Sequence, residues 1–277
     1  MNNSRKNPNL VCVVVPVYKS SLTNNEQISL MQCLRILGKY PIILAAPQTL
    51  DVSHLTKPYP QLQVRTFDDS YFKDIQAYNR LMLSEEFYQA FTDFDYMLIH
   101  QLDAFVFQDE LTDWCRRGYD YIGAPWLRDR DFIDWKDEAV FTVKKKVALW
   151  LDLKKEDGVT PREITSLNGV GNGGFSLRKV SSLLRWIRFF RKKIANYEKI
   201  HAHQYNEDVF WGIEINRYFP ILSIPDFRTA MRFAVEFYPE RAIANYNNGH
   251  LPFGCHAWDI HGTDYWRPIF ATYGYTI

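Results

Sequence analysis

Hydrophobic residues gather in four short, continuous runs within the first hundred residues. The runs are Leu10–Val17, Pro41–Ala46, Leu62–Thr66 and Tyr96–His100. Continuous apolar runs of this length are typical of strands that are buried on both faces of a largely parallel sheet. Each run is therefore predicted to be a strand of the core.

Between these runs, hydrophobic positions recur at helical spacing. Asn24 or Asn25 can cap a helix that Gly38 ends, and a second helix is predicted from about Asp74 to Phe91. Strands that alternate with helices of this length predict right-handed crossovers and a doubly wound α/β sheet.

The regular alternation ends near position 123. Residues 124–168 hold tryptophans and charged runs but no clear strand, so we expect a helical or loop insertion, or a lid, at the carboxyl edge of the sheet. Further helices are predicted over Val180–Tyr197 and from Asp208 to about Tyr218. A length of 277 residues suits one α/β domain with an insertion, so residues 1–277 are expected to form a single domain.

Composition removes several classes of function. Lys and Arg number 33 against 32 Asp and Glu, a net charge of +1, so we expect no nucleic-acid partner held by an overall basic field. A hydrophobic share of 47% excludes a disordered chain. The aromatic share of 16% is unusual, and it indicates either an aromatic-rich core or stacking surfaces for a ligand.

Two features bear on where the protein works. The first apolar run is too short for a secretory signal and is broken by Pro16, and no apolar stretch reaches the length of a membrane span, so a cytoplasmic location is expected. Eight basic residues lie in the segment from Arg178 to Lys199, against Glu198 alone. This helix is interpreted either as a solvated face or as a peripheral contact with the anionic inner face of a membrane.

The ends of the predicted strands supply the first candidate site residues, because ligands of open α/β sheets bind beyond the carboxyl ends of the strands. Pro16, Val17 and Tyr18 end the first strand, and Gln101 and Asp103 follow the fourth. An aspartate in this position can hold a divalent cation, and it can equally be a turn residue or a helix cap.

Two later motifs also bring together residues that can carry chemistry. Gly169–Leu177 is rich in glycine, which lets a backbone approach a ligand or make a tight turn, but its spacing matches neither the Walker nor the Rossmann loop. Glu207 and Asp208 begin a predicted helix, where an acid either compensates the helix dipole or serves as a general base.

The tail contains two histidines. His256 and His261 are five residues apart, which suits neither one helix face nor one strand face, so a two-histidine metal site is not expected. His256 is instead either a structural histidine or a partner of Asp103 on a cation.

Taken in order, these motifs resemble the GT-A class of nucleotide-sugar glycosyltransferases, and most closely a family of bacterial glycosyltransferase-like domains of unknown function. The resemblance implies an α/β, GT-A-like and Rossmann-related fold, with a mixed, mostly parallel central sheet flanked by helices. The segments that carry it are VVVPVY at 13–18, YNRLMLSEEFY at 78–88, YMLIHQLDAFVF at 96–107, YDYIGAPW at 119–126, VGNGGFSLR at 170–178, EDVFWG at 207–212 and PFGCHAW at 252–258.

The resemblance also implies roles for single residues. Asp208 would deprotonate the acceptor, with Glu207 as the second candidate, and Asp103 and His256 would hold Mn²⁺ or Mg²⁺. Gln101 stands where the D-x-D metal motif has its first acid, which leaves a single carboxylate on the metal. The residues implied in donor binding are Pro16, Val17, Tyr18, Tyr78, Asn79, Gln101, Asp103, Gly173 and Gly174.

These roles predict an enzyme that moves a sugar from a nucleotide sugar, expected to be a UDP-sugar, to a hydroxyl of a saccharide or lipid-linked glycan. One base and no evident nucleophile favour inversion. Aromatic residues of 124–150 and 258–275 are expected to hold the acceptor sugar. Two other interpretations are a carbohydrate-binding or inactive relative, favoured by Gln101, and a nucleotidyltransferase, disfavoured because Tyr18–Ser21 contains no glycine.

Overall fold

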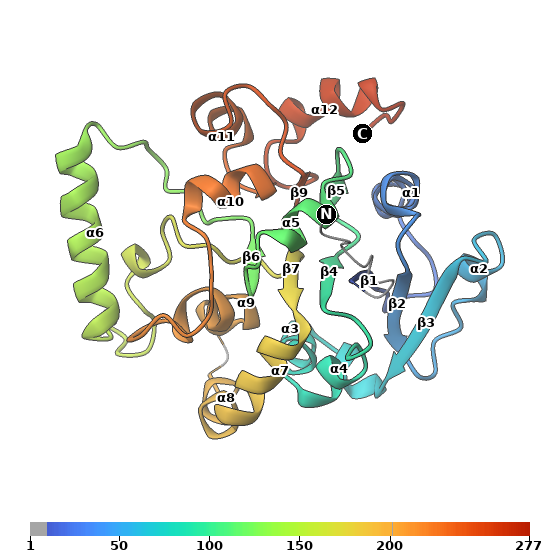
Figure 1. The fold of residues 1–277 in the computed structure, drawn as a ribbon, viewed down its shortest axis with the longest axis horizontal. Helices are drawn as coiled ribbons and strands as arrows, with labels where there is room; N and C mark the ends of the chain where they lie inside the picture. The colour runs from blue at the N-terminus through green and yellow to red at the C-terminus, as the bar shows by residue number, and fades with distance from the viewer. Residues whose placement is uncertain (1–9, 201) are drawn as a thin grey trace, which may run out of the picture.

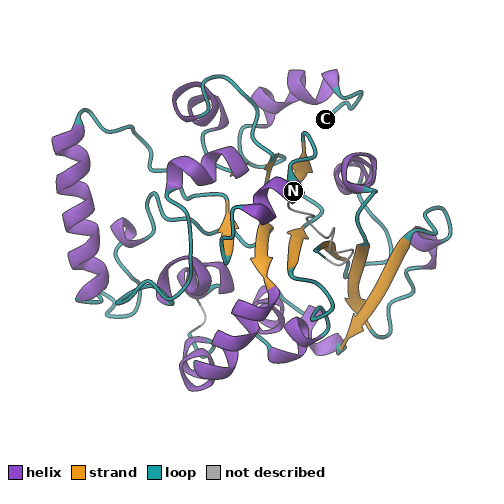
Figure 2. Ribbon diagram, in the orientation of Figure 1, coloured by secondary structure: helices purple, strands orange, loops and turns teal. Residues whose placement is uncertain are grey.

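The computed structural model describes residues 10–200 and 202–277, and a six-stranded sheet lies at its centre (Figure 1, Figure 2). In spatial order the strands are β3 (Leu62–Phe67), β2 (Ile42–Pro47), β1 (Val11–Pro16), β4 (Tyr96–His100), β7 (Phe175–Lys179) and β6 (Tyr121–Gly123). Strands β3, β2, β1 and β4 are parallel, whereas β7 is antiparallel to both of its neighbours. The predicted strands and the mixed sheet flanked by helices are confirmed.

The side chains of β1 alternate between two cores, which explains why its sequence is apolar throughout. Val13 and Val15 face one core, and Cys12 and Val14 face the other. The first core is bordered by α1 (Asn24–Leu37), α2 (Ser53–Thr56), α5 (Leu111–Arg116), α10 (Phe227–Phe233), α11 (Pro239–Tyr246) and α12 (Thr263–Thr272). The second is bordered by α3 (Ile75–Met82), α4 (Glu85–Gln89), α7 (Val180–Phe189) and α8 (Arg191–Tyr197).

The helix boundaries differ from the prediction in several places. Thr23 caps α1 through a capping box with Glu26, in place of Asn24 or Asn25. The single helix expected over 74–91 is divided into α3 and α4, because the Ser84 hydroxyl accepts the Phe87 N–H and starts a new helix. The helix expected over 180–197 is likewise divided, into α7 and α8.

The helix predicted from Asp208 is shorter than expected and irregular. Residues Glu207–Val209 form α9, and a π-helical turn, η4 (Phe210–Glu214), follows at once. Such turns are frequent at functional sites. The short 3₁₀ segments are η1 (Asp69–Phe72), η2 (Glu163–Thr165) and η3 (His203–Tyr205).

A second, small sheet joins three segments that are far apart in the sequence. Its strands are β5 (Phe105–Val106), β9 (Gly254–Cys255) and β8 (Ala234–Val235). Because β5 is antiparallel to β9 and β9 is parallel to β8, the start of β5 and the ends of the other two meet at one edge. Asp103 precedes β5, Glu236 follows β8 and His256 follows β9, so pairing of three very short strands brings these polar side chains together.

Residues 124–168 form the expected insertion between β6 and β7. Its regular structure consists of α6 (Trp135–Trp150) and η2, with only isolated β-bridges. In Figure 1, α6 stands at one edge of the molecule, away from the central sheet. Within the described ranges, no helix has the length and apolar character needed to cross a membrane. The expectation of a single domain over residues 1–277 stays a prediction.

Candidate functional site

A cavity of about 790 Å³ opens at the carboxyl ends of β1 and β4. All but one of the site residues predicted from the sequence line it; the exception is Val17, which is buried in the core. The predicted residues that line the cavity are Pro16, Tyr18, Tyr78, Asn79, Gln101, Asp103, Gly173, Gly174, Glu207, Asp208 and His256. The fold therefore places these residues in one cavity, while their individual roles stay predictions.

On one part of the wall, His256 lies between two carboxylates. Its Nε2 atom is 3.1 Å from Asp103 Oδ1 and 3.3 Å from Gln101 Oε1, and its Nδ1 atom is 3.5 Å from Glu236 Oε1. Burial lowers the pKa of His256, but the charge of Asp103 and the contact with Glu236 outweigh burial and raise that pKa to about 10. Burial likewise raises the pKa of Asp103, and the charge of His256 outweighs it and holds that pKa below its ordinary value.

The same atoms suit a divalent cation that brings other ligands with it. A cation with ligands at about 2.1 Å places neighbouring ligand atoms about 3 Å apart, close to the spacing of Asp103, Gln101 and His256 around Nε2. Glu236 meets the other ring nitrogen and stands outside such a set. Within the described ranges, no three His, Cys, Asp or Glu side chains are arranged to hold a metal. Phosphate oxygens and water would have to complete the coordination.

Sequence reasoning missed Glu236 and Asn172, which support this cluster. Asn172 Nδ2 donates to Glu236 Oε2 at 2.5 Å, and Asn172 Oδ1 accepts the Gly174 N–H at 3.1 Å. Glu236 follows a two-residue strand and belongs to no sequence motif, so nothing local marks it. Asn172 lies inside the glycine-rich loop and has a positive φ of 54°, a conformation that asparagine tolerates. The position of Asn172 between two glycines was the one feature of the sequence that could have marked it as a site residue.

Gly173 and Gly174 lie so close to neighbouring side chains that no larger residue fits at either position without displacing them. A Cβ atom on Gly173 would overlap the Glu207 carboxylate, and one on Gly174 would overlap His256 Nε2. The Gly174 carbonyl accepts the Gln101 N–H at 2.8 Å, which joins the loop to the end of β4. The loop therefore passes between the His256 cluster and the start of α9.

Glu207 is held by a buried arginine. Arg178 Nη2 lies 2.8 Å from Glu207 Oε1, and Arg178 also donates to Ser176 Oγ, Tyr88 Oη and the Gly173 carbonyl. Burial raises the pKa of Glu207, and the charge of Arg178 opposes that rise. This ion pair indicates that Glu207 fixes the start of α9.

Asp208, the next residue, differs from Glu207 in having no positively charged partner among the described residues. Its Oδ1 atom accepts the Val209 N–H at 2.8 Å, and across the described parts of the chain no Lys, Arg or His side chain is paired with it. Burial and the charge of Glu207 raise the pKa of Asp208 to about 7. A half-buried carboxylate with a pKa near neutrality suits proton transfer.

Asn79 and the two tyrosines occupy different depths of the cavity. Asn79 Oδ1 accepts the Glu207 N–H at 3.1 Å, and its Nδ2 donates to Asn206 Oδ1 at 2.9 Å, so Asn79 fastens the start of α9 to α3. Burial raises the pKa of Tyr78, which lies on α3. Tyr18 is 58% exposed and stands free to stack on a ligand.

The aromatic residues of 124–150 and 258–275, which were expected to hold the acceptor sugar, do not line this cavity, and acceptor binding by these segments stays a prediction. Trp258 and Trp266 are fully buried in the core, and Trp135 and Trp150 are exposed on α6. Many of the aromatic residues are buried in the two cores or packed against them.

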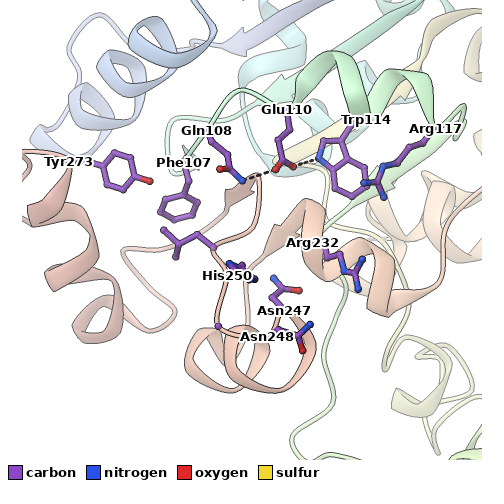
Figure 3. A pocket seen from close by; sticks show the side chains of 12 residues that line it. Phe107, Gln108, Glu110, Trp114, Arg117, Arg232, Asn247, Asn248, His250 and Tyr273 are labelled. Atoms are coloured by element: carbon purple, nitrogen blue, oxygen red, sulfur yellow. Dashed lines mark hydrogen bonds between the residues drawn. The ribbon is translucent and has the colours of Figure 1, made fainter.

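A second cavity, of about 690 Å³, lies between α5, α10 and the turn after α11 (Figure 3). Its single lining acid, Glu110, accepts the Trp114 indole N–H at 3.0 Å and an amide N–H of Gln108 at 2.6 Å. Figure 3 shows Arg117 beside Trp114, with Arg232 below it. With its one acid engaged, this cavity lacks a free carboxylate for acid–base chemistry, in contrast to the first.

Several basic residues of the segment 178–199 form ion pairs within the protein. Arg178 is buried, and Arg188 and Arg191 both pair with Glu85. Membrane contact through this segment stays a prediction.

A family profile described as "Protein of unknown function (DUF5672)" matches residues 61–256. No curated protein matches the chain. The galactosyltransferase LgtC, solved with donor and acceptor sugar analogues, is similar at a TM-score of 0.51 and 13% identity, over 88% of this chain and 86% of LgtC. This likeness shows that the chain has the GT-A glycosyltransferase fold.

Two further solved structures are similar at lower scores. Mouse xyloside xylosyltransferase 1 matches at a TM-score of 0.49 and 13% identity, over 89% of this chain and 97% of that protein. The glycosyltransferase GlyE of Streptococcus pneumoniae TIGR4 matches at a TM-score of 0.46 and 14% identity, over 90% of this chain and 54% of GlyE.

Proposed function

This chain belongs to the DUF5672 family, and from its GT-A fold and its acidic cavity we propose that it is a glycosyltransferase. It moves a sugar from a nucleotide sugar, with UDP as the proposed nucleotide, to a hydroxyl of a saccharide or lipid-linked glycan. The observation that carries the proposal is Asp208, a carboxylate with a pKa near 7 and no paired cation in the described chain, in the same cavity as Asp103 and His256.

The donor diphosphate would lie at the Asp103 and His256 cluster. Asp103, His256 and the amide oxygen of Gln101 would hold Mn²⁺ or Mg²⁺ there, and such a cation supplies positive charge that neutralises a diphosphate leaving group. Glu236 Oε1 lies 3.5 Å from the other ring nitrogen of His256, and its charge would orient the imidazole. Tyr18 and Tyr78 offer aromatic surfaces for the nucleoside.

Asp208 would take the proton from the acceptor hydroxyl. The hydroxyl oxygen then forms a bond to the anomeric carbon of the donor, and the bond from that carbon to the phosphate oxygen breaks, with the electron pair leaving on the nucleotide diphosphate. One displacement inverts the anomeric centre. Proton NMR of the product reports its configuration, and a product that retains the donor's configuration would contradict this part of the proposal.

The proposed function is tested by thermal denaturation with UDP, GDP and UDP-sugars, each with and without Mn²⁺. We expect UDP to raise the melting temperature only with the metal, and the Asp103→Asn variant to lose that response. Glu110→Gln, in the second cavity, serves as the matched control and should respond like the unaltered protein. Failure of every nucleotide to stabilise the protein, with or without metal, would overturn the proposal.

Gln101 favours one alternative, a carbohydrate-binding or inactive protein that keeps the fold without transfer. That function predicts stabilisation by nucleotide sugars or glycans but no release of UDP when donor and acceptor are both supplied. A coupled assay for free UDP, run on a panel of saccharide acceptors, separates the two functions.

A further inference from the structure

Helix α6 carries a stripe of apolar side chains on its outer face. Val140, Val143, Val147 and Trp150 follow one another at intervals of three, four and three residues, and their exposed fractions are 53%, 61%, 46% and 67%. This spacing places all four on one side of an α-helix. Trp135, at the other end of α6, is 74% exposed. A continuous exposed stripe of this kind marks an interaction surface.

Lysines border the stripe. At 100° per residue, Lys144 and Lys146 lie on opposite sides of it, and Lys136 lies within it near the first turn. All three lysines are exposed. The surface thus combines apolar side chains, a tryptophan at each end of the helix and flanking positive charge.

The opposite face holds α6 firmly to the rest of the protein. Glu138 pairs with Arg228 at 2.7 Å, and Lys145 Nζ donates to the Leu167 carbonyl at 2.8 Å. Ala148 is buried on this face. The inner face is therefore already occupied, and the exposed stripe faces away from the body to which these contacts fix it.

We propose that this outer face of α6 binds the surface of an anionic lipid membrane. The valines and Trp150 would enter the boundary between headgroups and acyl chains, and Lys144 and Lys146 would contact anionic headgroups. The occupant follows from charge complementarity, because both flanks of the stripe are positive. The proposal concerns a different face from the basic segment 178–199, and it does not depend on transferase activity.

The test is vesicle flotation of the full chain at low and high salt. One set of vesicles contains equal parts of phosphatidylglycerol and phosphatidylcholine, and the other contains phosphatidylcholine alone. We expect binding to the anionic vesicles that weakens with salt, and at least tenfold weaker binding for Val143→Glu/Val147→Glu. Both valines are exposed and glutamate is a good helix former, so this variant should fold, which circular dichroism checks.

Two further variants sharpen the result. Lys144→Glu/Lys146→Glu should remove the preference for anionic vesicles. Phe189→Glu, at a 72% exposed position of the segment 178–199, should bind like the unaltered protein. Absence of binding, or binding that the valine variant leaves unchanged, would overturn the proposal. So would a dimer in sedimentation that Val143→Glu/Val147→Glu dissociates without any vesicle binding, because the stripe would then be a protein interface.

Discussion

Two acidic clusters face the same cavity, and they differ in the positively charged side chain that lies beside their carboxylates. Glu207 is paired with Arg178, a fully buried guanidinium that donates to several other oxygens. Asp103 and Glu236 instead share one imidazole, that of His256. A guanidinium stays charged at every accessible pH, whereas an imidazole can release its proton and bind a metal.

The two clusters are therefore expected to have different roles, one structural and one chemical. The Arg178 cluster is a permanent ion pair that fixes the start of α9. In the proposed function, the His256 cluster would exchange its proton for a cation. Asp208 follows Glu207 in the chain but is not paired with Arg178. Burial and the charge of Glu207 therefore raise the pKa of Asp208 to about 7.

The largest expected effect is on folding. Arg178→Met leaves Glu207 as an unpaired buried charge, so the free energy of unfolding should fall by about 3–5 kcal/mol. Denaturant titration measures the loss. Arg191→Met is the control, because that arginine is exposed and solvent screens its surface pair with Glu85, so its loss should change stability little. The double variant Arg178→Met/Glu207→Leu should recover much of the loss, and a double variant as unstable as Arg178→Met would argue against the ion pair as the cause.

The next effect concerns the other cluster. Glu236→Gln keeps the shape of the side chain but removes the negative charge beside His256 Nδ1, and loss of such a partner costs about 10–100-fold in metal affinity. Calorimetry with Mn²⁺ in the presence of UDP measures it. If Glu236→Gln binds Mn²⁺ as tightly as the unaltered protein, Glu236 does not orient the imidazole.

A third prediction concerns the loop between the clusters. Gly174→Ala puts a methyl group into the space of His256 Nε2, so His256 must shift at a cost of about 1–3 kcal/mol. We expect a lower melting temperature and no stabilisation by UDP with Mn²⁺. Gly158→Asn is the control, since that position is open and asparagine tolerates its positive φ of 68°. A Gly174→Ala protein that still responds fully to UDP and Mn²⁺ would show that the loop does not set the site.

The smallest effect is a dependence of stability on pH. The pKa of Asp208 is about 7 in the folded protein and about 4 in an unfolded chain. Between these values the unfolded chain releases its proton first, so this carboxyl destabilises the fold increasingly from pH 4 to pH 7 and fully above pH 7. Asp208→Asn should therefore unfold with a free energy about 1–2 kcal/mol higher at pH 8, and with no gain at pH 4. A gain of equal size at both pH values would remove titration of Asp208 as the cause.

The sequence predicted the main sheet well, because β1, β2 and β4 are apolar on both faces and leave a clear pattern. The pattern also brought Pro16, Tyr18, Gln101 and Asp103 to one cavity, since parallel strands end at a common edge. Gly173, Gly174 and Asp208 joined them only through the resemblance to GT-A glycosyltransferases. Strands of two residues leave no periodic signal, so β5, β8 and β9 were missed, and Glu236 with them.

The role of the aromatic residues could not be predicted from their number. Trp258 and Trp266 are core residues, whereas Trp135 and Trp150 are exposed on α6. These pairs have the same chemistry in the sequence, and only tertiary packing separates them. In the same way, Glu207 and Asp208 are adjacent acids whose difference arises from Arg178, an arginine that lies 29 positions before Glu207.

In the proposed mechanism Glu207 fixes the start of α9 while Asp208 carries out proton transfer. The most direct test measures UDP affinity and the rate of sugar transfer for Asp208→Asn at pH 8, in the presence of Mn²⁺. We expect UDP affinity close to that of the unaltered protein and a transfer rate about 10²–10⁴-fold lower, the usual contribution of a general base. Transfer at the unaltered rate by Asp208→Asn would contradict this mechanism.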